Sequence, residues 1–534
     1  MSNQEVNKKI IEELIKTKVK NSESLSLAKR KLAKKYKTAI LQNSDIFEIY
    51  KKLLDEKKIK KNYEFEKFLR KRAIRTLSGI APVAVLTKYY PCPGKCAYCP
   101  TEKDVPQSYL SNEPAVMRAI RCNYDPYVQV QSRLRALEAN GHEPTKIELI
   151  VIGGTWSCLP KNYKFWYITE CFRAANDYSR SVIRKSQIKK PDQSRQKRFS
   201  ASLKTTELIK FLGKEQKKNE KAKYKIIGLT LETRPDYINE KELWEMRNLG
   251  CTRVELGVQA IDDEILKLNK RGHGVKEIGD ATKLLKDFGF KATYHIMPGL
   301  PGSTPSKDFK MFKNLFADER FQPDQIKFYP TVVTKGSLLF RWWKQGKYKP
   351  YSNKNLWNLI IKCKQIIPEY VRIIRLIRDI PGESIMAGNM VTNLRQVMKN
   401  KGVECRCIRC REARDRIIKN YKIKIINYKA SGGEEFFISA ESKDGKFLYG
   451  FCRLRLGEKA IIRELHVYGE LVSVGSKKKI QHAGLGKKLM GEAEKITQNN
   501  NYDKIQVISG IGARGYYRKL GYKLDKTYMI KSLK

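Results

Sequence analysis

Two kinds of segment alternate through the middle of the chain, across residues 76–380. Short β-branched runs, typical of buried strands, are separated by longer stretches with helical spacing of apolar residues. The pattern predicts strands at residues 83–87, 147–153, 225–232, 253–258, 291–297 and 325–333, and helices at residues 125–139, 240–249 and 274–288. This repetition predicts a parallel α/β sheet or barrel, in which the loops that follow the strands carry the chemistry.

The whole chain divides into four predicted parts. Its 534 residues are enough for two to four domains, at roughly 150 residues each. We expect a basic helical region at residues 1–75, the barrel at 76–380, a cysteine-rich connector at 381–415 and a second α/β domain at 416–534. That last part shows four strand patterns, a glycine turn, a helix, a fifth strand and a final helix.

The amino terminus and the lack of long apolar runs indicate an intracellular, reducing compartment. No apolar core with a cleavage site follows Met1, and no apolar run approaches the length of a membrane span. We therefore expect a cytoplasmic protein with no membrane partner. Twelve cysteines in such a compartment are poor candidates for disulfides, and six of them form two tight groups, which indicates metal binding.

The first cysteine group follows the first predicted strand and consists of Cys92, Cys96 and Cys99. Three thiolates on one tight loop can ligate three irons of a 4Fe-4S cluster and leave the fourth iron open. The alternative is a structural zinc site, which usually has four ligands and an x2 spacing in each cysteine pair. The C-x3-C-x2-C spacing, without a fourth cysteine nearby, favours the cluster.

The second group, Cys405, Cys407 and Cys410, packs three thiols into six residues. We interpret it as a structural zinc site with a fourth ligand from elsewhere in the chain. Cys363 is a candidate for that ligand, although its helical apolar surroundings equally suit a core position. The alternative is three free thiols.

Glycines and polar residues follow four successive predicted strands. A glycine pair lets the backbone approach a ligand closely, and polar side chains at the same edge of a sheet can hold one. Each loop alone could be turn chemistry, but four in succession indicate a binding site. The candidate residues are Gly153, Gly154, Thr155, Glu232, Arg234, Gln259, His295, Met297, Pro298 and Gly299.

A glycine-rich segment near residue 484 follows a predicted strand and begins a predicted helix. Small residues at a helix start expose backbone N–H groups that bind phosphate. The candidate phosphate-binding residues are Gln481, Gly484, Leu485, Gly486 and Lys487. Downstream, Tyr516 and Tyr517 are either coenzyme contacts or aromatic core.

These motifs resemble known families. The cysteine loop is similar to that of the radical S-adenosylmethionine superfamily, and the glycine segment is similar to the pyrophosphate loop of GNAT acetyltransferases. Their combination, with residues 117–121, 463–469 and 515–519, resembles the family of the Elongator catalytic subunit, including its stand-alone archaeal and bacterial forms. The resemblance implies a partial (β/α) barrel that binds a 4Fe-4S cluster and S-adenosylmethionine, followed by a GNAT domain that binds acetyl-CoA.

The resemblance also implies an activity, namely carboxymethylation of carbon 5 of the tRNA wobble uridine, uridine 34, with acetyl-CoA as donor. It implies that the strand-end residues contact S-adenosylmethionine, that Tyr517, beside Tyr516, donates a proton to the leaving thiolate, and that an electron donor is a partner. It places further residues beside acetyl-CoA, namely Lys146, Glu464, Leu465, His466 and Val467. The oligomeric state stays open between a monomer and a homodimer.

Two other functions fit parts of the sequence. A protein lysine acetyltransferase with the barrel as scaffold would need a general base, for which Glu464 or His466 could serve. An RNA-binding scaffold with vestigial cofactor loops is the non-enzymatic alternative, but the complete cysteine triad and phosphate loop argue against it.

The charge is unusual, with 108 Lys and Arg residues against 56 Asp and Glu residues and a formal net charge of +52. Either a polyanion such as tRNA balances it or the protein is broadly lysine-rich. Residues 1–80 and 180–204 carry net charges of +12 and +8, so we expect these two segments to hold phosphates. Within the second segment the candidates are Arg184, Lys185, Lys189, Lys190, Arg195, Lys197 and Arg198.

Overall fold

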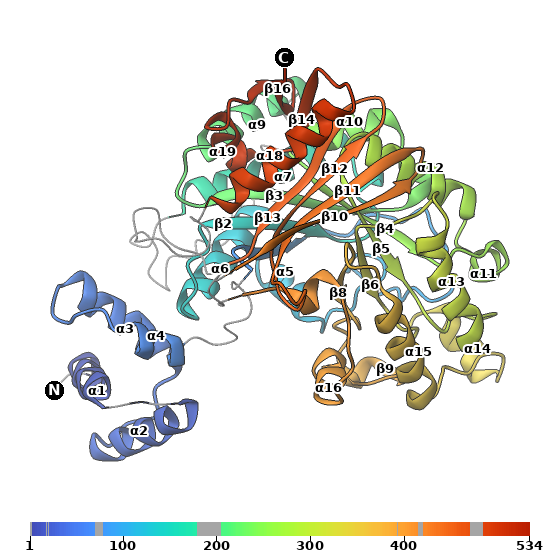
Figure 1. The fold of residues 1–534 in the computed structure, drawn as a ribbon. Coiled ribbons are helices and arrows are strands. Elements are labelled where there is room, and N and C mark those ends of the chain that lie inside the picture. Colours follow the sequence, from blue (N-terminus) through green and yellow to red (C-terminus); the bar gives the residue numbers. More distant parts are fainter. Residues whose placement is uncertain are drawn as a thin grey trace.

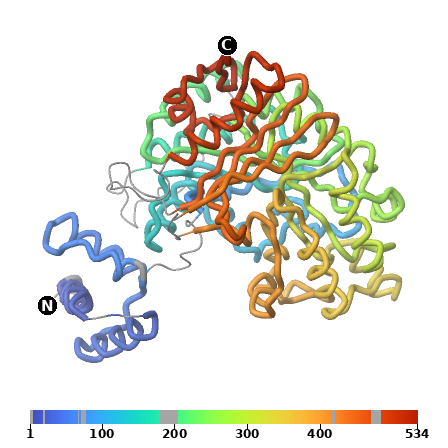
Figure 2. The backbone as a smooth tube through the Cα atoms, viewed as in Figure 1, coloured from blue at the N-terminus to red at the C-terminus, as the bar shows by residue number. Residues whose placement is uncertain are grey.

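The structure is a computed structural model, drawn in Figures 1 and 2. It describes residues 3–17, 19, 21–69, 78–178, 204–391, 393–414, 420–469 and 484–534. Within these residues, no helix combines the length and the apolar character that crossing a bilayer demands.

Seven parallel strands form the central sheet, in the order β1-β2-β3-β4-β5-β6-β8. In the described residues β1 and β8 are its free edges, so the sheet is a half-barrel and not a closed one. This confirms the predicted fold class. The strands are β1 (Ala81–Leu86), β2 (Lys146–Ile152), β3 (Lys225–Thr233), β4 (Arg253–Gln259), β5 (Lys291–Ile296), β6 (Gln325–Phe328) and β8 (Arg372–Arg375).

Helices alternate with these strands along the chain, as Figure 1 shows. Helix α10 shows how the sequence sets their ends, because the Asn239 side chain caps its start and Gly250, with φ of 92°, ends it. The helices of this part are α5 (Pro114–Arg121), α6 (Pro126–Ala139), α7 (Lys161–Asn176), α9 (Thr205–Asn219), α10 (Glu240–Leu249), α11 (Asp263–Leu268), α12 (Val275–Asp287), α13 (Pro305–Ala317), α14 (Leu338–Lys344) and α15 (Asn353–Ile366).

The segments after β6 differ from the sequence prediction. The single strand predicted at residues 325–333 is two strands, β6 and β7 (Val333–Thr334), and β7 pairs with β9 (Ile385–Ala387) outside the main sheet. Strand β8 was not predicted, because four residues are too few to show a pattern. The connector also holds α16 (Leu394–Asn400) and α17 (Ile408–Arg411).

The carboxyl-terminal domain is a seven-stranded mixed sheet against helix α18 (Leu485–Asn499). Strand β13 pairs in parallel with β14 only as far as Ile462 and Val507, then continues along β12 to Val467. The two strands therefore separate beyond Ile462, and the edge of β13 is open. The strands are β10 (Lys422–Ala430), β11 (Gly433–Glu441), β12 (Leu448–Leu456), β13 (Ala460–Val467), β14 (Lys504–Val507), β15 (Lys523–Asp525) and β16 (Tyr528–Ser532).

The end of this domain corrects a prediction. The sequence predicted a final helix, and α19 (Arg514–Arg518) is present, but the chain then returns through β15 and β16 and pairs with β14. The reason is length: two short strands joined by a tight turn carry too few residues for a clear period.

The first part of the chain is helical, as predicted. Four helices, α1 (Asn3–Lys16), α2 (Ser22–Lys35), α3 (Asn43–Asp55) and α4 (Tyr63–Leu69), pack around an apolar core of their own. In Figure 2 these blue helices lie beside the main body, whereas the red and orange carboxyl-terminal domain lies directly against the half-barrel.

A buried network of charges joins the half-barrel to the carboxyl-terminal domain. The Arg463 guanidinium on β13 donates to Asp324 Oδ1, just before β6, at 2.9 Å and to Glu435 Oε2 on β11 at 2.8 Å. Lys286 of α12 pairs with Glu435 at 3.3 Å. All four side chains are at most 1% exposed. Burial alone would raise the pKa of Asp324, but the surrounding cations outweigh it and hold the pKa below the ordinary range.

The glycine turn after β14 makes the second close contact between the domains. A Cβ atom at Gly510 would overlap the Ile227 carbonyl of β3, and one at Gly512 would lie 2.6 Å from Lys225 Cβ. Only glycine lets the two backbones approach this closely. The network and this turn fix the orientation of the two domains.

Replacing Asp324 by Asn should destabilise the protein by about 3–5 kcal/mol, because it removes one of the two carboxylates that compensate the buried Arg463 charge and leaves only Glu435. The measurement is the free energy of unfolding in denaturant. The matched control is Asp280→Asn, which removes an exposed pair with Lys276 (2.7 Å) and should change stability little. Equal losses in the two variants would show that the buried network has no special role.

Candidate functional site

The first cysteine group lies beyond the carboxyl end of β1 and is held by neighbouring loops. Ala97 N donates to Asn269 O at 3.0 Å, and Leu339 N of α14 donates to Ala97 O at 2.7 Å. The Cys92 thiol lies 3.8 Å from Thr155 Oγ1, past the end of β2. Cys96 is buried, whereas Cys92 and Cys99 are partly exposed.

The electrostatics around Cys96 favour a thiolate. Arg271, on the loop after α11, donates to Cys96 Sγ at 3.3 Å. A hydrogen bond from the Cys99 thiol and the charge of the nearby guanidinium groups outweigh burial and lower the pKa of Cys96 to about 5. Thiolate is the form that ligates iron, and buried cations offset the negative charge of a thiolate-bound cluster. The donor set therefore fits a 4Fe-4S cluster.

A cavity of about 1050 Å³ opens beside this loop and extends into the half-barrel. Most of the residues predicted at the strand ends line it, namely Gly154, Thr155, Glu232, Arg234, Gln259, His295 and Met297, together with the three cysteines. Gly153, Pro298 and Gly299 lie outside that lining. Gly153 packs against Thr87, and Gly299 is tied to Asp308 Oδ2 through its N–H (2.8 Å).

Two lining residues have unused polar atoms. Gln259 Oε1 and Arg234 Nη1 are buried and have no hydrogen-bond partner within the described residues. Gln259 also has a positive φ of 71°, a strained conformation for a residue other than glycine. Unpaired buried polar atoms are costly, so a polar ligand such as S-adenosylmethionine fits these residues.

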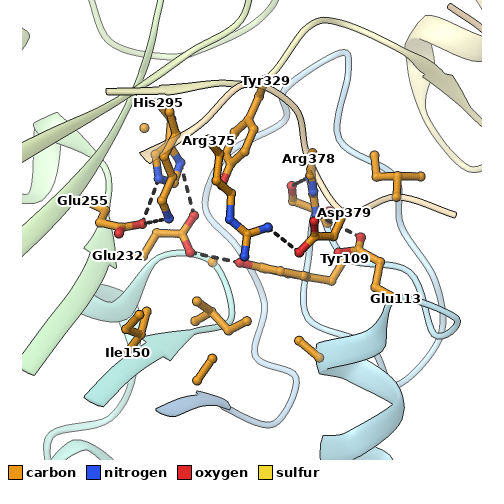
Figure 3. A pocket seen from close by; sticks show the side chains of 18 of the residues that line it. Tyr109, Glu113, Ile150, Glu232, Glu255, His295, Tyr329, Arg375, Arg378 and Asp379 are labelled. Carbon is orange, nitrogen blue, oxygen red and sulfur yellow. Dashed lines mark hydrogen bonds and ion pairs between the residues drawn. The ribbon is translucent and has the colours of Figure 1, made fainter. Parts of the chain in front are cut away.

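The carboxylates of the cavity are organised by His295, as Figure 3 shows. His295 Nε2 lies 3.0 Å from Glu255 Oε2, and His295 Nδ1 lies 3.6 Å from Glu232 Oε1. The Tyr109 hydroxyl donates to Glu232 Oε2 at 3.0 Å. Lys327 also pairs with Glu255. Burial would raise the pKa of this carboxyl, but the Lys327 charge and the hydrogen bond with His295 outweigh it and hold the pKa well below the ordinary value.

Several of these lining residues were missed by the sequence analysis. Two of them, Glu255 and Lys327, could have been found from the sequence, because each is a charged residue within a buried strand. Side chains alternate between the two faces of a strand, so such a charge is expected to face the lumen of the barrel. Other lining residues carry no such signal, because they reach the cavity from loops and from the unpredicted strand β8. They are Tyr109, Arg271, Tyr329, Arg375 and Arg378.

The second cysteine group is compact. The thiols of Cys405, Cys407 and Cys410 lie within 4.8 Å of one another, at the start of α17. Hydrogen bonds from the other two thiols lower the pKa of Cys407 despite its burial. Cys363 is buried on α15 and is not part of the group, while its neighbour Lys364 lies 3.9 Å from Cys410 Sγ. Three thiol donors suit zinc.

The residues of β13 that we predicted to bind acetyl-CoA lie on two faces of the strand, one toward the half-barrel and one toward the core of the carboxyl-terminal domain. Glu464 pairs with Lys291 of the half-barrel at 3.4 Å and with Arg453 at 3.1 Å. His466 Nε2 lies 2.9 Å from the Ser78 carbonyl, just before β1. Leu465 and Val467 pack instead against the core of their own domain. Lys146, at the start of β2, pairs in register with Lys225, the neighbour of the Gly512 turn.

The two predicted acetyl-CoA residues of this strand that can titrate, Glu464 and His466, have fixed charge states at neutral pH. Burial would raise the pKa of Glu464, but Lys291 and Arg453 outweigh it and lower the pKa to about 2. Burial lowers the pKa of His466 below its ordinary value. Glu464 is therefore ionised and His466 neutral.

The glycine segment and the tyrosines converge at the start of α18. Gly484 precedes the helix with φ of 75°, and Leu485 is buried in the core while Lys487 is exposed. A Cβ atom at Gly486 would lie 2.6 Å from the Tyr516 hydroxyl. The rings of Tyr516 and Tyr517 are 5.3 Å apart, with Tyr517 buried beneath. Burial raises the pKa of both phenols, that of Tyr516 to about 12, so both carry a proton at neutral pH.

Some predicted residues lie outside the described residues. These are Gln481 and the basic candidates Arg184, Lys185, Lys189, Lys190, Arg195, Lys197 and Arg198.

Family models match most of the chain. The radical SAM superfamily matches residues 87–314, the radical SAM C-terminal domain matches residues 323–402, and the acetyltransferase (GNAT) family matches residues 404–522. The first two models cover most of the half-barrel and of the connector, and the third covers most of the carboxyl-terminal domain.

Whole-length relatives combine the same domains. The chain is 42% identical over 487 residues to the tRNA uridine(34) acetyltransferase of Dehalococcoides mccartyi, covering 87% of this chain and 100% of that protein. It is 38% identical over 501 residues to Elongator complex protein 3 of Homo sapiens, covering 87% and 86%. A solved structure of Elp3 from Methanocaldococcus infernus, with an N-terminal deletion, is 38% identical and superposes with a TM-score of 0.69, covering 85% of this chain and 99% of that one. The chain therefore belongs to the family that includes the tRNA uridine(34) acetyltransferases and Elongator complex protein 3.

Proposed function

We propose that the chain attaches a carboxymethyl group to carbon 5 of uridine 34 in tRNA, with acetyl-CoA as the source of the two carbons. The names of the relatives support the substrate. The observation that carries the proposal is that buried contacts join the half-barrel, which holds the cysteine loop, to the domain that holds the open strand β13. A radical site and a thioester site in fixed relation suit a reaction that needs both.

The residues have distinct roles in this proposal. Cys92, Cys96 and Cys99 hold the cluster, which with S-adenosylmethionine supplies hydrogen-abstracting radical chemistry. Arg271 keeps Cys96 ionised, and the unpaired atoms of Arg234 and Gln259 are partners for S-adenosylmethionine. The other strand-end residues complete that pocket.

On the thioester side, the backbone N–H groups at the start of α18 hold the pyrophosphate of the coenzyme. The open edge of β13 positions its acyl arm, and Lys146 lies at the same end of the half-barrel. Tyr516 or Tyr517 donates a proton to the leaving thiolate, because both phenols are protonated at neutral pH.

The structure disfavours a protein lysine acetyltransferase. That reaction needs a free base, and Glu464 is held between Lys291 and Arg453 with a pKa of about 2, so it accepts a proton poorly. His466 uses Nε2 as a donor to the Ser78 carbonyl. The two residues that could have served as the base are therefore engaged in contacts with the half-barrel.

The proposed function also includes a cellular location, an electron donor, a zinc site and a tRNA-binding surface. The substrate implies a cytoplasmic location, and the radical chemistry implies an electron donor. Zinc binds Cys405, Cys407 and Cys410 and stabilises the connector between the domains. The basic segments at residues 1–75 and 184–198 hold tRNA phosphates.

Anaerobic incubation of the reconstituted protein with tRNA, acetyl-CoA and S-adenosylmethionine should give carboxymethyluridine, detected by mass spectrometry of tRNA nucleosides. The Cys96→Ala variant should give none, because the cluster loses a ligand, while its affinity for CoA is unchanged. Carboxymethyluridine from the variant, or a protein substrate acetylated by it at the wild-type rate, would contradict the proposal.

The purified protein should contain one zinc ion per chain in elemental analysis, and the Cys407→Ser variant should lose it. The control is Cys363→Ser, which changes a buried cysteine outside the group and should retain the metal. Zinc that persists in the Cys407→Ser variant would exclude this site.

Changing the seven basic residues between 184 and 198 to Ala should weaken tRNA binding and reduce the slope of log affinity against log salt, because fewer counterions are released. The measurement is a filter-binding titration at several salt concentrations. Seven lysines changed elsewhere on the surface serve as the control for total charge. An unchanged slope would assign this charge to the lysine-rich background.

A further inference from the structure

The two proposed sites lie at opposite ends of the half-barrel. Lys146 begins β2 on the side of the carboxyl-terminal domain, whereas Gly154 and Thr155 follow its other end beside Cys92. At roughly 3.3 Å per residue, the length of this strand separates the two ends by ~20 Å. A reaction that joins them needs a route through or around the sheet.

The cavity is such a route, because its lining covers the strands from end to end. On β2 it includes Glu148, Ile150 and Ile152, and on β4 it includes Arg253 and Gln259. The alternation of β2 explains this, since its even-numbered residues are partly exposed while the odd-numbered ones are buried under the helices.

Small side chains on β1 keep the lumen open. In a closed barrel the inward side chains fill the interior in layers. Here Pro82 and Ala84 of β1 line the cavity, and Ala84 lies beside its register partner Ile150 on β2. In the described residues the sheet does not close between β1 and β8. Figure 3 shows Ile150 on the floor of the space below Glu232 and Glu255.

The base of the cavity adjoins the acetyl-CoA strand. Ser78 lines the cavity, and its carbonyl contacts His466. Arg372 also lines it and donates to the Tyr468 hydroxyl, just after β13, at 3.0 Å. The Glu148 carboxylate interacts electrostatically with Lys291 and Glu464. Each of these lining residues therefore interacts directly with β13, with the residue that follows it, or with a charged partner of β13.

We propose that the lumen of the half-barrel is the passage in which the acyl end of the bound thioester reaches the radical site. The acetyl group enters at the base, between Ser78, Glu148 and Arg372, and lies beside Ala84 and Ile150. The Glu148–Arg253 ion pair, at 3.0 Å, forms one wall of the entrance. This inference rests on the proposed function and adds the direction from which the donor approaches.

A reactive acyl group tests the passage directly. Bromoacetyl-CoA alkylates a thiol that its acyl end can reach, so the Ala84→Cys variant of the reconstituted protein should be modified at position 84, and excess acetyl-CoA should suppress the modification. Mass spectrometry of peptides maps the adduct. The control is Ile425→Cys, on an exposed position of β10 in the domain that binds CoA. Alkylation at position 84 no faster than at position 425 would overturn the proposal.

Narrowing the lumen gives a second, independent test. Ile150→Phe should lower carboxymethyluridine formation by ~100-fold, because a small displacement of reacting groups has an effect of this size. Its affinities for S-adenosylmethionine and CoA, measured by calorimetry, should match the wild type, as should those of the exposed control Ile425→Phe. Carboxymethyluridine formation at the wild-type rate by the Ile150→Phe variant would overturn the proposed passage.

Failure of the passage and failure of the proposed function give different results. A wild-type protein that forms no carboxymethyluridine contradicts the function, whatever the alkylation shows. Alkylation depends on neither tRNA nor electron transfer, so an unmodified Ala84→Cys variant contradicts the passage alone.

Discussion

The buried contact of Arg463 with Asp324 and Glu435 is the interaction on which the rest of the structure depends. It joins β13 of one domain to the loop before β6 of the other without exposure to water. A buried charge is tolerated only with its partners in place, so the network penalises any other orientation of the domains. Because Arg463 fixes the position of β13, the neighbouring residues Glu464 and His466 are also held facing the half-barrel.

This constraint is the reason for our proposal that the thioester strand serves the half-barrel and not an external amine. The polar side chains of β13 that could act as bases are committed to Lys291, Arg453 and the Ser78 carbonyl. Its apolar Leu465 and Val467 side chains pack in the core that includes α18. The open edge where β13 leaves β14 therefore lies at the base of a half-barrel whose far end carries the cysteine loop. Residues that line this cavity, Ser78 and Arg372, contact β13 and the residue that follows it.

The sequence allowed the fold and the local motifs to be predicted because these depend on short-range patterns. Cys92, Cys96 and Cys99 lie within eight residues, and the strands of the half-barrel carry continuous β-branched runs. Partners distant in the chain could not be predicted in this way. Arg271 contacts Cys96 from 175 residues away, and nothing in its own neighbourhood indicates that contact. The short strands β8, β15 and β16 were missed because pairing, and not periodicity, defines them.

The central claim is that the radical site and the thioester site act on the same acetyl group. Acetyl-CoA deuterated in the methyl group tests it most directly, with the 5′-deoxyadenosine from the complete reaction with tRNA analysed by mass spectrometry. The account predicts one deuterium in 5′-deoxyadenosine for each carboxymethyluridine formed, and loss of that deuterium from the product. Carboxymethyluridine formed with unlabelled 5′-deoxyadenosine would contradict it.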